Sequence, residues 1–315
     1  MGGFIIKRLV HALWVMAGVV SLTFFLMHFT GADPALIIAL DRYGSQLVSP
    51  DTVRTLAREQ GLDQPLFTQF CQWIILVADG DLGNSLRTGL PVTREILGRL
   101  PATLTLALAS VGISAFMGIP LGILTAARPE GRLDRITRFL SAVKVSIPGF
   151  YTAMLLIYLF SFRLGWLPGF GTGSLRHHVL PVAVLVVGQL GFTLRVSRSA
   201  ALDVLQAPWV AHARLRGVPR FRIYHAHVLR NAAVPILTYL SLQFLMALEG
   251  AVIVESIFAW PGVGRLLQES VMGRDFTLVQ GLGLFFSAAI VLVNLAVDLL
   301  YQLLDRKIPM TGGRP

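Results

Sequence analysis

Residues 100–127 read LPATLTLALASVGISAFMGIPLGILTAA, and this stretch decides the fold class because it contains no Asp, Glu, Lys or Arg. About 20 consecutive apolar residues are enough for a helix to cross a bilayer. Five further runs of at least 18 residues also lack these charged residues: 9–32, 145–162, 177–194, 231–248 and 276–297. These runs are predicted to be helices, because every backbone N–H and C=O group inside lipid needs a hydrogen-bond partner within the protein. A β-barrel is the other solution, but the sequence has no alternating ten-residue pattern that suggests one.

The predicted fold is an all-α integral membrane bundle of six transmembrane helices in one domain covering residues 1–315. The spans are predicted at about 9–30, 102–127, 139–162, 179–199, 233–254 and 278–302, with Pro148-Gly149 interrupting the third. Composition agrees, since 54% of the residues are hydrophobic and only 14% are charged, against about 25% charged in an ordinary soluble domain. A soluble α/β domain with a thick core is the disfavoured alternative.

The net charge of +10 is distributed unevenly along the chain. Basic residues crowd the segments between spans two and three and between spans four and five, and they flank both ends of the bundle. The short loops on the other side hold only Arg163, Arg176, Arg265 and Arg274. This positive-inside bias predicts that both termini are cytoplasmic. Topology and attraction to acidic lipid head groups therefore account for the basic charge, without nucleic acid as a partner.

The same topology places the long loop 31–100 outside the cytoplasm and the loop 203–230 inside it. In the outer loop, Ser49-Pro50-Asp51 predicts the start of a helix that ends near Gly61. A second helix is predicted from Pro65, with an apolar stripe that suits the membrane surface, a partner protein or the chain's own spans. The first span is interpreted as retained, because no small-residue cleavage site follows it. The lone Cys71 permits no internal disulfide.

The inner loop contains the stretch 209–217, WVAHARLRG, followed by Leu229-Arg230-Asn231-Ala232 and Pro235. From the residues alone, Gly217 permits the positive φ of a sharp turn, and the simplest alternative is a basic loop that only fixes topology. The stretch resembles the EAA loop of ABC importer permeases, with Trp209 in place of the usual Tyr. The resemblance implies a coupling helix that docks on an ATP-binding subunit. The coupling residues that it assigns are Trp209, Val210, Ala213, Arg214, Gly217, Arg230 and Asn231.

A second motif, ESIFAWPGVGR at residues 255–265, looks like the loop after span five in dipeptide, oligopeptide and nickel permeases. Arg274-Asp275-Phe276 continues the likeness, although Thr277 stands where these permeases usually have Pro. The residues predicted to shape the translocation path and its outer gate are Glu249, Glu255, Phe258, Pro261, Gly262 and Gly264. Glu249 departs from the small residue of the family. It either faces the path and favours cationic cargo, or pairs within the bundle.

The resemblance covers nearly the whole chain and implies a permease subunit in a bacterial inner membrane. The implied partners are a second homologous permease, two ATP-binding subunits, a periplasmic substrate-binding protein and membrane lipids. No catalytic residue, cofactor or metal ligand is expected in this chain, and ATP with Mg²⁺ is expected in the partner subunits. A Walker A loop needs a lysine after glycine, and none of Lys7, Lys144 and Lys307 follows one. The seven histidines lack the spacing of a tight metal site.

The cargo and three other classes of protein remain open. Small differences in the motifs favour nickel or a metal chelate over di- and oligopeptides. A secondary transporter without ATPase partners would show inverted repeats and an ion relay in the membrane, and a channel would show a filter or a charged ring. A membrane enzyme would need a polar cluster at membrane depth, for which only Glu249 and Asp298 are candidates. The sequence displays none of these features.

Overall fold

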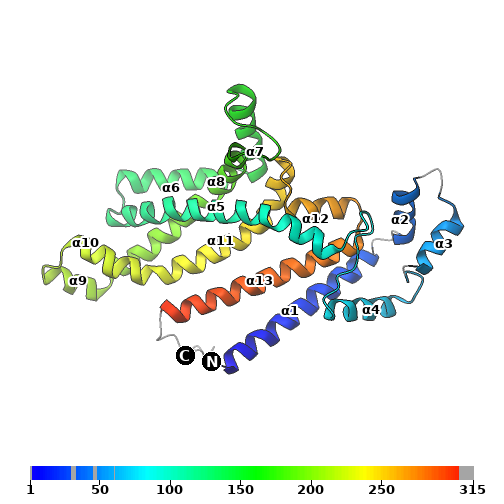
Figure 1. Ribbon diagram of the computed structural model, residues 1–315. Coiled ribbons are helices and arrows are strands. Elements are labelled where there is room, and N and C mark those ends of the chain that lie inside the picture. Colours follow the sequence, from blue (N-terminus) through cyan, green and yellow to red (C-terminus); the bar gives the residue numbers. More distant parts are fainter. Residues whose placement is uncertain (1, 30–32, 45–47, 60, 305–315) are drawn as a thin grey trace. The chain divides into compact units, whose positions relative to one another are not determined.

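The computed structural model describes residues 2–29, 33–44, 48–59 and 61–304 (Figure 1). Regular structure in that part of the chain is helical, and β pairing is limited to a single bridge between Asn84 and Pro91. The elements are α1 (Gly2–Phe29), α2 (Pro34–Tyr43), α3 (Pro50–Glu59), α4 (Leu66–Ala78), α5 (Val92–Ala127), α6 (Arg132–Val145), α7 (Gly149–Leu156), η1 (Ile157–Arg163), α8 (Leu175–Gln206), α9 (Pro208–Leu215), α10 (Arg220–Arg222), η2 (Ile223–Val228), α11 (Leu229–Ile257), α12 (Val263–Met272) and α13 (Phe276–Leu304). The helical fold class is thereby confirmed.

Among the described helices, α5, α8, α11 and α13 are long and apolar enough to cross a membrane. A fifth span is counted if α6 and the segment α7–η1 form one broken crossing, since they are bent by 99°. The predicted third span, 139–162, is therefore two helices rather than one. Pro148 explains the break, because its ring disfavours helical geometry at the residue before it and its own ψ of 145° is extended. In α1, the stretch Ala12–Leu26, whose side chains the structure describes, is an apolar helical segment.

The Cα positions divide the chain into two compact units. The first unit comprises residues 1–101 and 265–292, and the second unit comprises residues 102–264 with the last part of α13. The prediction of one domain remains a prediction.

The first unit contains the helices of the long loop. Trp73 and Phe70 of α4 pack against Val20, Phe24 and Phe25 of α1. Thus one side of the apolar stripe predicted after Pro65 covers the chain's own first helix. The predicted start of α3 is also confirmed, because the Ser49 hydroxyl accepts a hydrogen bond from the Thr52 N–H at 3.2 Å. Capping of this kind satisfies one of the free donors of a helix N-terminus.

The second unit is built on close packing of α8 against α5 and α11. Glycine makes the approach of α5 possible: a Cβ at Gly122 would lie 2.7 Å from the Leu194 carbonyl oxygen. A buried polar cluster joins the three helices. Thr193 Oγ1 lies 2.8 Å from Ser114 Oγ and donates to Gln243 Oε1 at 3.0 Å, and Gln243 Nε2 donates to the Gln189 carbonyl at 3.1 Å. Since these side chains form hydrogen bonds with one another and with the Gln189 carbonyl, the apolar helices can accommodate them.

Candidate functional site

The inner loop folds as the short helix α9, and its end requires glycine at position 217. Gly217 has φ of +75°, its N–H donates to the Arg214 carbonyl at 3.0 Å, and the Val218 N–H donates to the Ala213 carbonyl at 3.1 Å. This is the Schellman arrangement, in which a left-handed residue closes the helix. The sharp turn expected at Gly217 is confirmed. The remaining question is what α9 presents to its surroundings.

Val210 anchors α9 to the second unit. Its side chain is fully buried in a cluster with Ala126, Ala201, Ile223 and Val228. This cluster brings together α5, α8, α9 and η2, so a displacement of α9 would be passed to the long helices. The sequence pattern identified Val210 as a family residue, and the structure gives it an inward-facing position.

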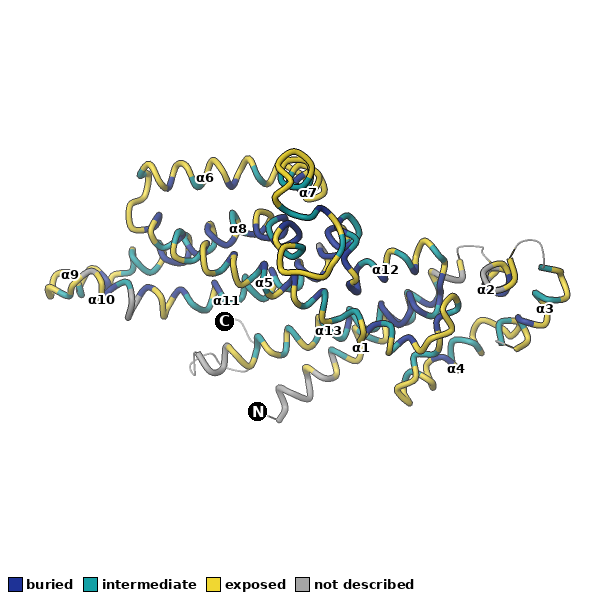
Figure 2. Tube along the Cα trace, turned by 45° about the horizontal axis from the view of Figure 1, so that its top comes forward, coloured by how far each residue is buried: buried dark blue, intermediate teal, exposed yellow. Residues whose placement is uncertain are grey.

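The other side of the inner loop is exposed, as Figure 2 shows for α9 and α10. Leu215 is 85% exposed, Phe221 is 80% exposed and Trp209 is 43% exposed. Arg214, Gly217, Arg230 and Asn231 are exposed as well, and Ala213 is partly buried. Large apolar side chains beside guanidinium groups are typical of protein interfaces. The surface formed by Trp209, Arg214, Leu215 and Phe221 is called the coupling surface below.

An ion pair that the motifs did not indicate ties α6 to α8. The Asp134 carboxylate is fully buried and accepts two hydrogen bonds from Arg198, Nε to Oδ1 at 2.5 Å and Nη2 to Oδ2 at 2.8 Å. The Glu130 N–H also donates to Asp134 Oδ2, at 3.0 Å. A paired, multiply hydrogen-bonded carboxylate fixes geometry more than it adds stability. The pair therefore fixes the start of α6 against α8.

The ESIFAWPGVGR motif covers the end of α11, the turn that follows it and the start of α12. Residues 255–264 are called the outer turn, after the side of the membrane predicted for them. Glu255 is fully buried and accepts a hydrogen bond from the Thr103 hydroxyl at 2.6 Å. Thr103 Oγ1 in turn accepts from the Val263 N–H at 2.8 Å. Gly262 packs directly on the Glu255 carboxylate, so that a Cβ there would overlap the carboxylate. Glu255 thus links the two ends of the outer turn to α5.

Aromatic residues complete the outer turn. The Trp260 N–H donates to the Glu255 carbonyl at 2.8 Å, and its indole N–H donates to the Ala102 carbonyl at 3.1 Å. Phe258 is buried in the main core of the second unit. Ala259 adopts a φ of +53°, which is uncommon for a residue other than glycine. Such a turn is rigid because its backbone groups and side chains are mutually bonded.

The predicted gate residues therefore have different surroundings. Glu255, Phe258, Gly262 and Gly264 are buried in the outer turn, and Pro261 is exposed on it. Glu249 is exposed on α11. Burial of Glu255 favours a positioning role over direct contact with cargo, and the gate assignment as a whole remains a prediction. Within the described residues, no group of three His, Cys, Asp or Glu side chains is arranged to hold a metal ion.

Several helices long and apolar enough to cross a membrane, with short helices between them, are typical of a helical membrane protein. Two family profiles match the chain, "binding-protein-dependent transport system inner membrane component" over residues 118–309 and its N-terminal counterpart over residues 1–107. The chain belongs to this family of ABC transporter permeases. It is a membrane subunit and not an enzyme, because ATP hydrolysis in such systems lies in separate subunits. Permeases of this family work with ATP-binding and substrate-binding partners.

Similar proteins match along nearly the full length. A putative peptide transport system permease of Brucella abortus is 37% identical over 98% of this chain and 99% of its own. The glutathione transport system permease GsiC of Salmonella typhimurium is 37% identical over 97% of this chain and 98% of its own. Among solved structures, the inward-facing MetNI methionine ABC transporter has a TM-score of 0.58 at 18% identity, covering 67% of this chain and 96% of that one. This last likeness supports the fold.

Proposed function

We propose that this chain is the transmembrane permease of an ATP-driven importer of short peptides. The observation that carries the proposal is its full-length similarity, at 37% identity, to permeases of peptide and glutathione transport systems. Both kinds of cargo are small peptides with free carboxylates. The evidence for the alternative cargo, nickel or a metal chelate, consists only of small differences in motifs that peptide permeases largely share. Neither of the two relatives named above is a nickel permease. Peptides are therefore preferred here.

Six spans with both termini in the cytoplasm are part of the proposal. The sixth crossing is α1, which at 28 residues is about 42 Å long at 1.5 Å per residue. Residues 9–29 of α1 contain no Asp, Glu, Lys or Arg, and about 20 apolar residues are enough to cross a bilayer. The distribution of Arg and Lys supports the cytoplasmic side for α9 and the outer side for residues 31–100.

The coupling surface is proposed to bind an ATP-binding subunit. It offers exposed apolar side chains at Trp209, Leu215 and Phe221, and its charge suits an acidic groove. We further propose the assembly implied by the resemblance: this chain with a second homologous permease, two ATP-binding subunits that hold ATP and Mg²⁺, and a periplasmic substrate-binding protein. No cofactor is proposed in this chain.

The proposed mechanism is a shift between two states of the permease pair. Nucleotide binding would draw the ATP-binding subunits together and displace α9, since a ligand shifts an equilibrium by binding one state better. Val210 would pass the displacement to α5 and α8 through its buried cluster. The outer turn, held by Thr103 and Glu255, would keep the outer ends of α5 and α11 in register as the path opens.

Uptake in cells with and without this gene tests the cargo. The cells are given a labelled dipeptide, labelled glutathione or radioactive nickel, each with the others as competitors. Loss of dipeptide or glutathione uptake alone supports the proposal. Loss of nickel uptake alone contradicts it and moves the chain to the metal branch, with Glu249 as the next residue to substitute.

A further inference from the structure

One side of α11 lies outside the packed core of the second unit and carries a carboxylate. Leu242 is 51% exposed, Met246 is 64% exposed and Ile253 is 52% exposed. Glu249 is exposed between Met246 and Ile253, and steps of three or four residues place all four side chains on one face of the helix. These four residues are called the exposed face of α11 below. The other side of the helix packs against α8.

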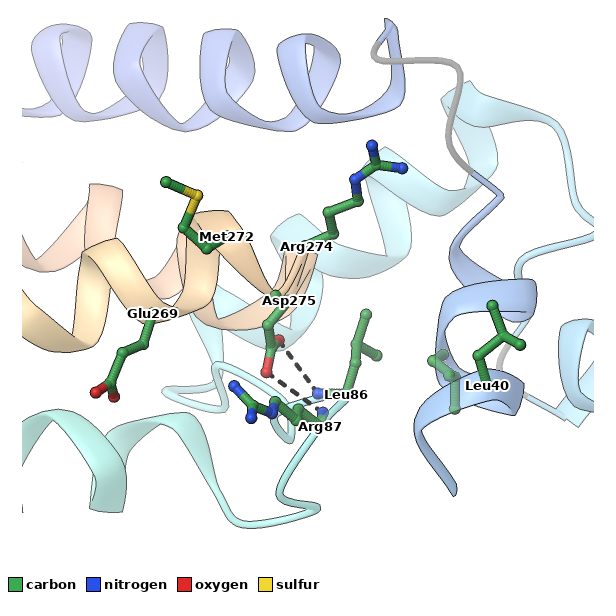
Figure 3. Close-up of a pocket in the computed structure, with 9 residues that line it drawn as sticks. Leu40, Leu86, Arg87, Glu269, Met272, Arg274 and Asp275 are labelled. Carbon is green, nitrogen blue, oxygen red and sulfur yellow. Dashed lines mark hydrogen bonds between the residues drawn. The ribbon is translucent and has the colours of Figure 1, made fainter. Parts of the chain in front are cut away.

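The Glu249 carboxylate has no partner in the described part of the chain, where no hydrogen bond or ion pair involves it. Other carboxylates are engaged. Glu255 accepts a hydrogen bond from a threonine hydroxyl of α5. Figure 3 shows that Asp275 accepts hydrogen bonds from the backbone N–H groups of Leu86, at 3.2 Å, and Arg87, at 3.4 Å. Glu249 is therefore available to a group that comes from outside this chain.

The spans of this chain offer no cation at the depth of Glu249. Glu249 lies six residues before Glu255, which is about 9 Å along the helix axis. This position is in the outer part of the predicted span 233–254. In the predicted topology, the outer halves of all six spans contain no Lys or Arg. A carboxylate that faces lipid is costly, so ionisable residues in spans usually face a protein interior or a water-filled cavity.

Two serine hydroxyls border the exposed face of α11. Ser256 lies seven residues after Glu249 and Ser241 lies eight residues before it, and both are half-buried. Their hydroxyls donate to the carbonyls of Val252 and Leu237, each at 2.7 Å. Because each hydroxyl proton is used in this way, the serine oxygens can only accept further hydrogen bonds. The polar groups on this side of α11 therefore suit water and cations, and they do not suit an anion.

We infer that Glu249 faces the translocation path and binds the N-terminal ammonium group of the peptide during transport. The inference rests on the proposed function, because it takes peptides as the cargo and the second permease as the other wall of the path. A peptide with a free N-terminus brings one ammonium group, which a carboxylate binds through charge-assisted hydrogen bonds. The inference adds to the proposed function a residue of the permease that selects the amino end of the cargo.

Cysteine labelling tests whether the exposed face of α11 meets water. The complete transporter in lipid nanodiscs carries Cys71→Ser with either Met246→Cys, on the turn next to Glu249, or the control Leu108→Cys on α5. The two natural side chains are similarly exposed, Met246 at 64% and Leu108 at 60%. A charged methanethiosulfonate reagent reacts with thiolate in water, so it should modify Met246→Cys about tenfold faster than Leu108→Cys. Mass spectrometry of this chain measures both rates, and equal rates overturn the inference.

Protection by peptides tests the ammonium contact. Alanyl-leucine and N-acetyl-alanyl-leucine, which lacks the ammonium group, are titrated against the labelling of Met246→Cys. Half-protection is expected at a roughly tenfold lower concentration of the free-amine peptide, as one charge-assisted contact allows. Glu249→Gln should abolish this difference, and Glu249→Asp should restore part of it. The matched control Glu59→Gln, which changes an exposed carboxylate on α3, should leave the difference unchanged.

Equal protection by the two peptides in the presence of Glu249, or an unchanged difference after Glu249→Gln, overturns the inference. If Glu249→Gln leaves the difference unchanged and releases the second permease in detergent, the carboxylate pairs with a cation of that subunit instead. Peptide uptake that survives deletion of the gene would refute the proposed function. Uptake that is lost on deletion, combined with equal protection by the two peptides, would refute this inference alone.

Discussion

At the scale of single residues, the outer turn depends on one hydroxyl group. Thr103 donates to the buried Glu255 carboxylate and accepts from the Val263 N–H, so it joins both ends of the outer turn to α5. Thr103 and Glu255 are 152 positions apart. Glu255 belongs to the ESIFAWPGVGR motif and Thr103 lies in the apolar run 100–127, but no local pattern relates the two. Their pairing is visible only in the folded chain.

Replacing Thr103 tests this arrangement. Thr103→Val removes one donor to a buried carboxylate and should destabilise the permease by about 1–3 kcal/mol, the usual cost of removing a hydrogen-bond partner of a buried polar group. Thr103→Ser keeps the hydroxyl and should restore most of the stability. Thermal unfolding of the three proteins in detergent measures the difference. A valine variant that unfolds at the wild-type temperature would show that Thr103 does not hold the outer turn.

Glu269 is the residue for which a pH effect is expected. Burial raises its pKa, but hydrogen bonds from Arg99 and Arg265 and their positive charges outweigh burial and hold the pKa below its usual range. A carboxylate with a lowered folded-state pKa stabilises the protein above its unfolded-state pKa, about 4.3 for glutamate. That contribution is lost as the pH falls through the lowered value. The effect is small, because the side chain is 38% exposed and water screens the charges.

The corresponding experiment compares the wild type with Glu269→Gln. The variant should unfold at a lower temperature than the wild type at pH 7. The gap should begin to narrow near the unfolded-state pKa of about 4.3 and should close once the pH has fallen through the lowered folded-state pKa of Glu269. An equal gap at both pH values would mean that the ion pairs with Arg99 and Arg265 contribute nothing to stability.

At the scale of elements, α9 shows what local sequence signals can predict. Its end at Gly217 follows from the conformational freedom of glycine, and the same kind of reasoning gave the start of α3 at Ser49-Pro50. The interruption predicted at Pro148-Gly149 in the third span is also present, since α6 ends at Val145 and α7 begins at Gly149. The two parts are bent by 99°. A proline marks a possible break, whereas the angle depends on packing against distant helices.

Gly217 also provides the element-scale prediction. Gly217→Pro is incompatible with a φ of +75° and removes the N–H that bonds Arg214. We expect membrane insertion to be retained and transport to be lost, because α9 would no longer be presented correctly. Gly217→Asn is the matched control, since asparagine tolerates the left-handed backbone, and it should retain most transport. Uptake and membrane content are measured together. Normal transport by the proline variant would exclude a coupling role for this turn.

At the scale of the whole molecule, the sequence was informative about class and much less so about contacts. Apolar runs and the distribution of basic residues predicted an all-helical membrane protein. The contacts that organise the functional surfaces join residues far apart in the chain, as in Asp134–Arg198, separated by 64 positions, and Ser85–Asp275, separated by 190. Only the folded chain brings these residues together.

The central claim is that this chain moves peptides by coupling to ATP hydrolysis in partner subunits. The most direct measurement is accumulation of a labelled dipeptide in vesicles that contain the purified transporter, with its binding protein at the outer face. The account predicts accumulation that requires ATP at the cytoplasmic face and that is lost when this chain is omitted or carries Gly217→Pro. Accumulation driven by a proton or sodium gradient without ATP would contradict the account and identify a secondary transporter.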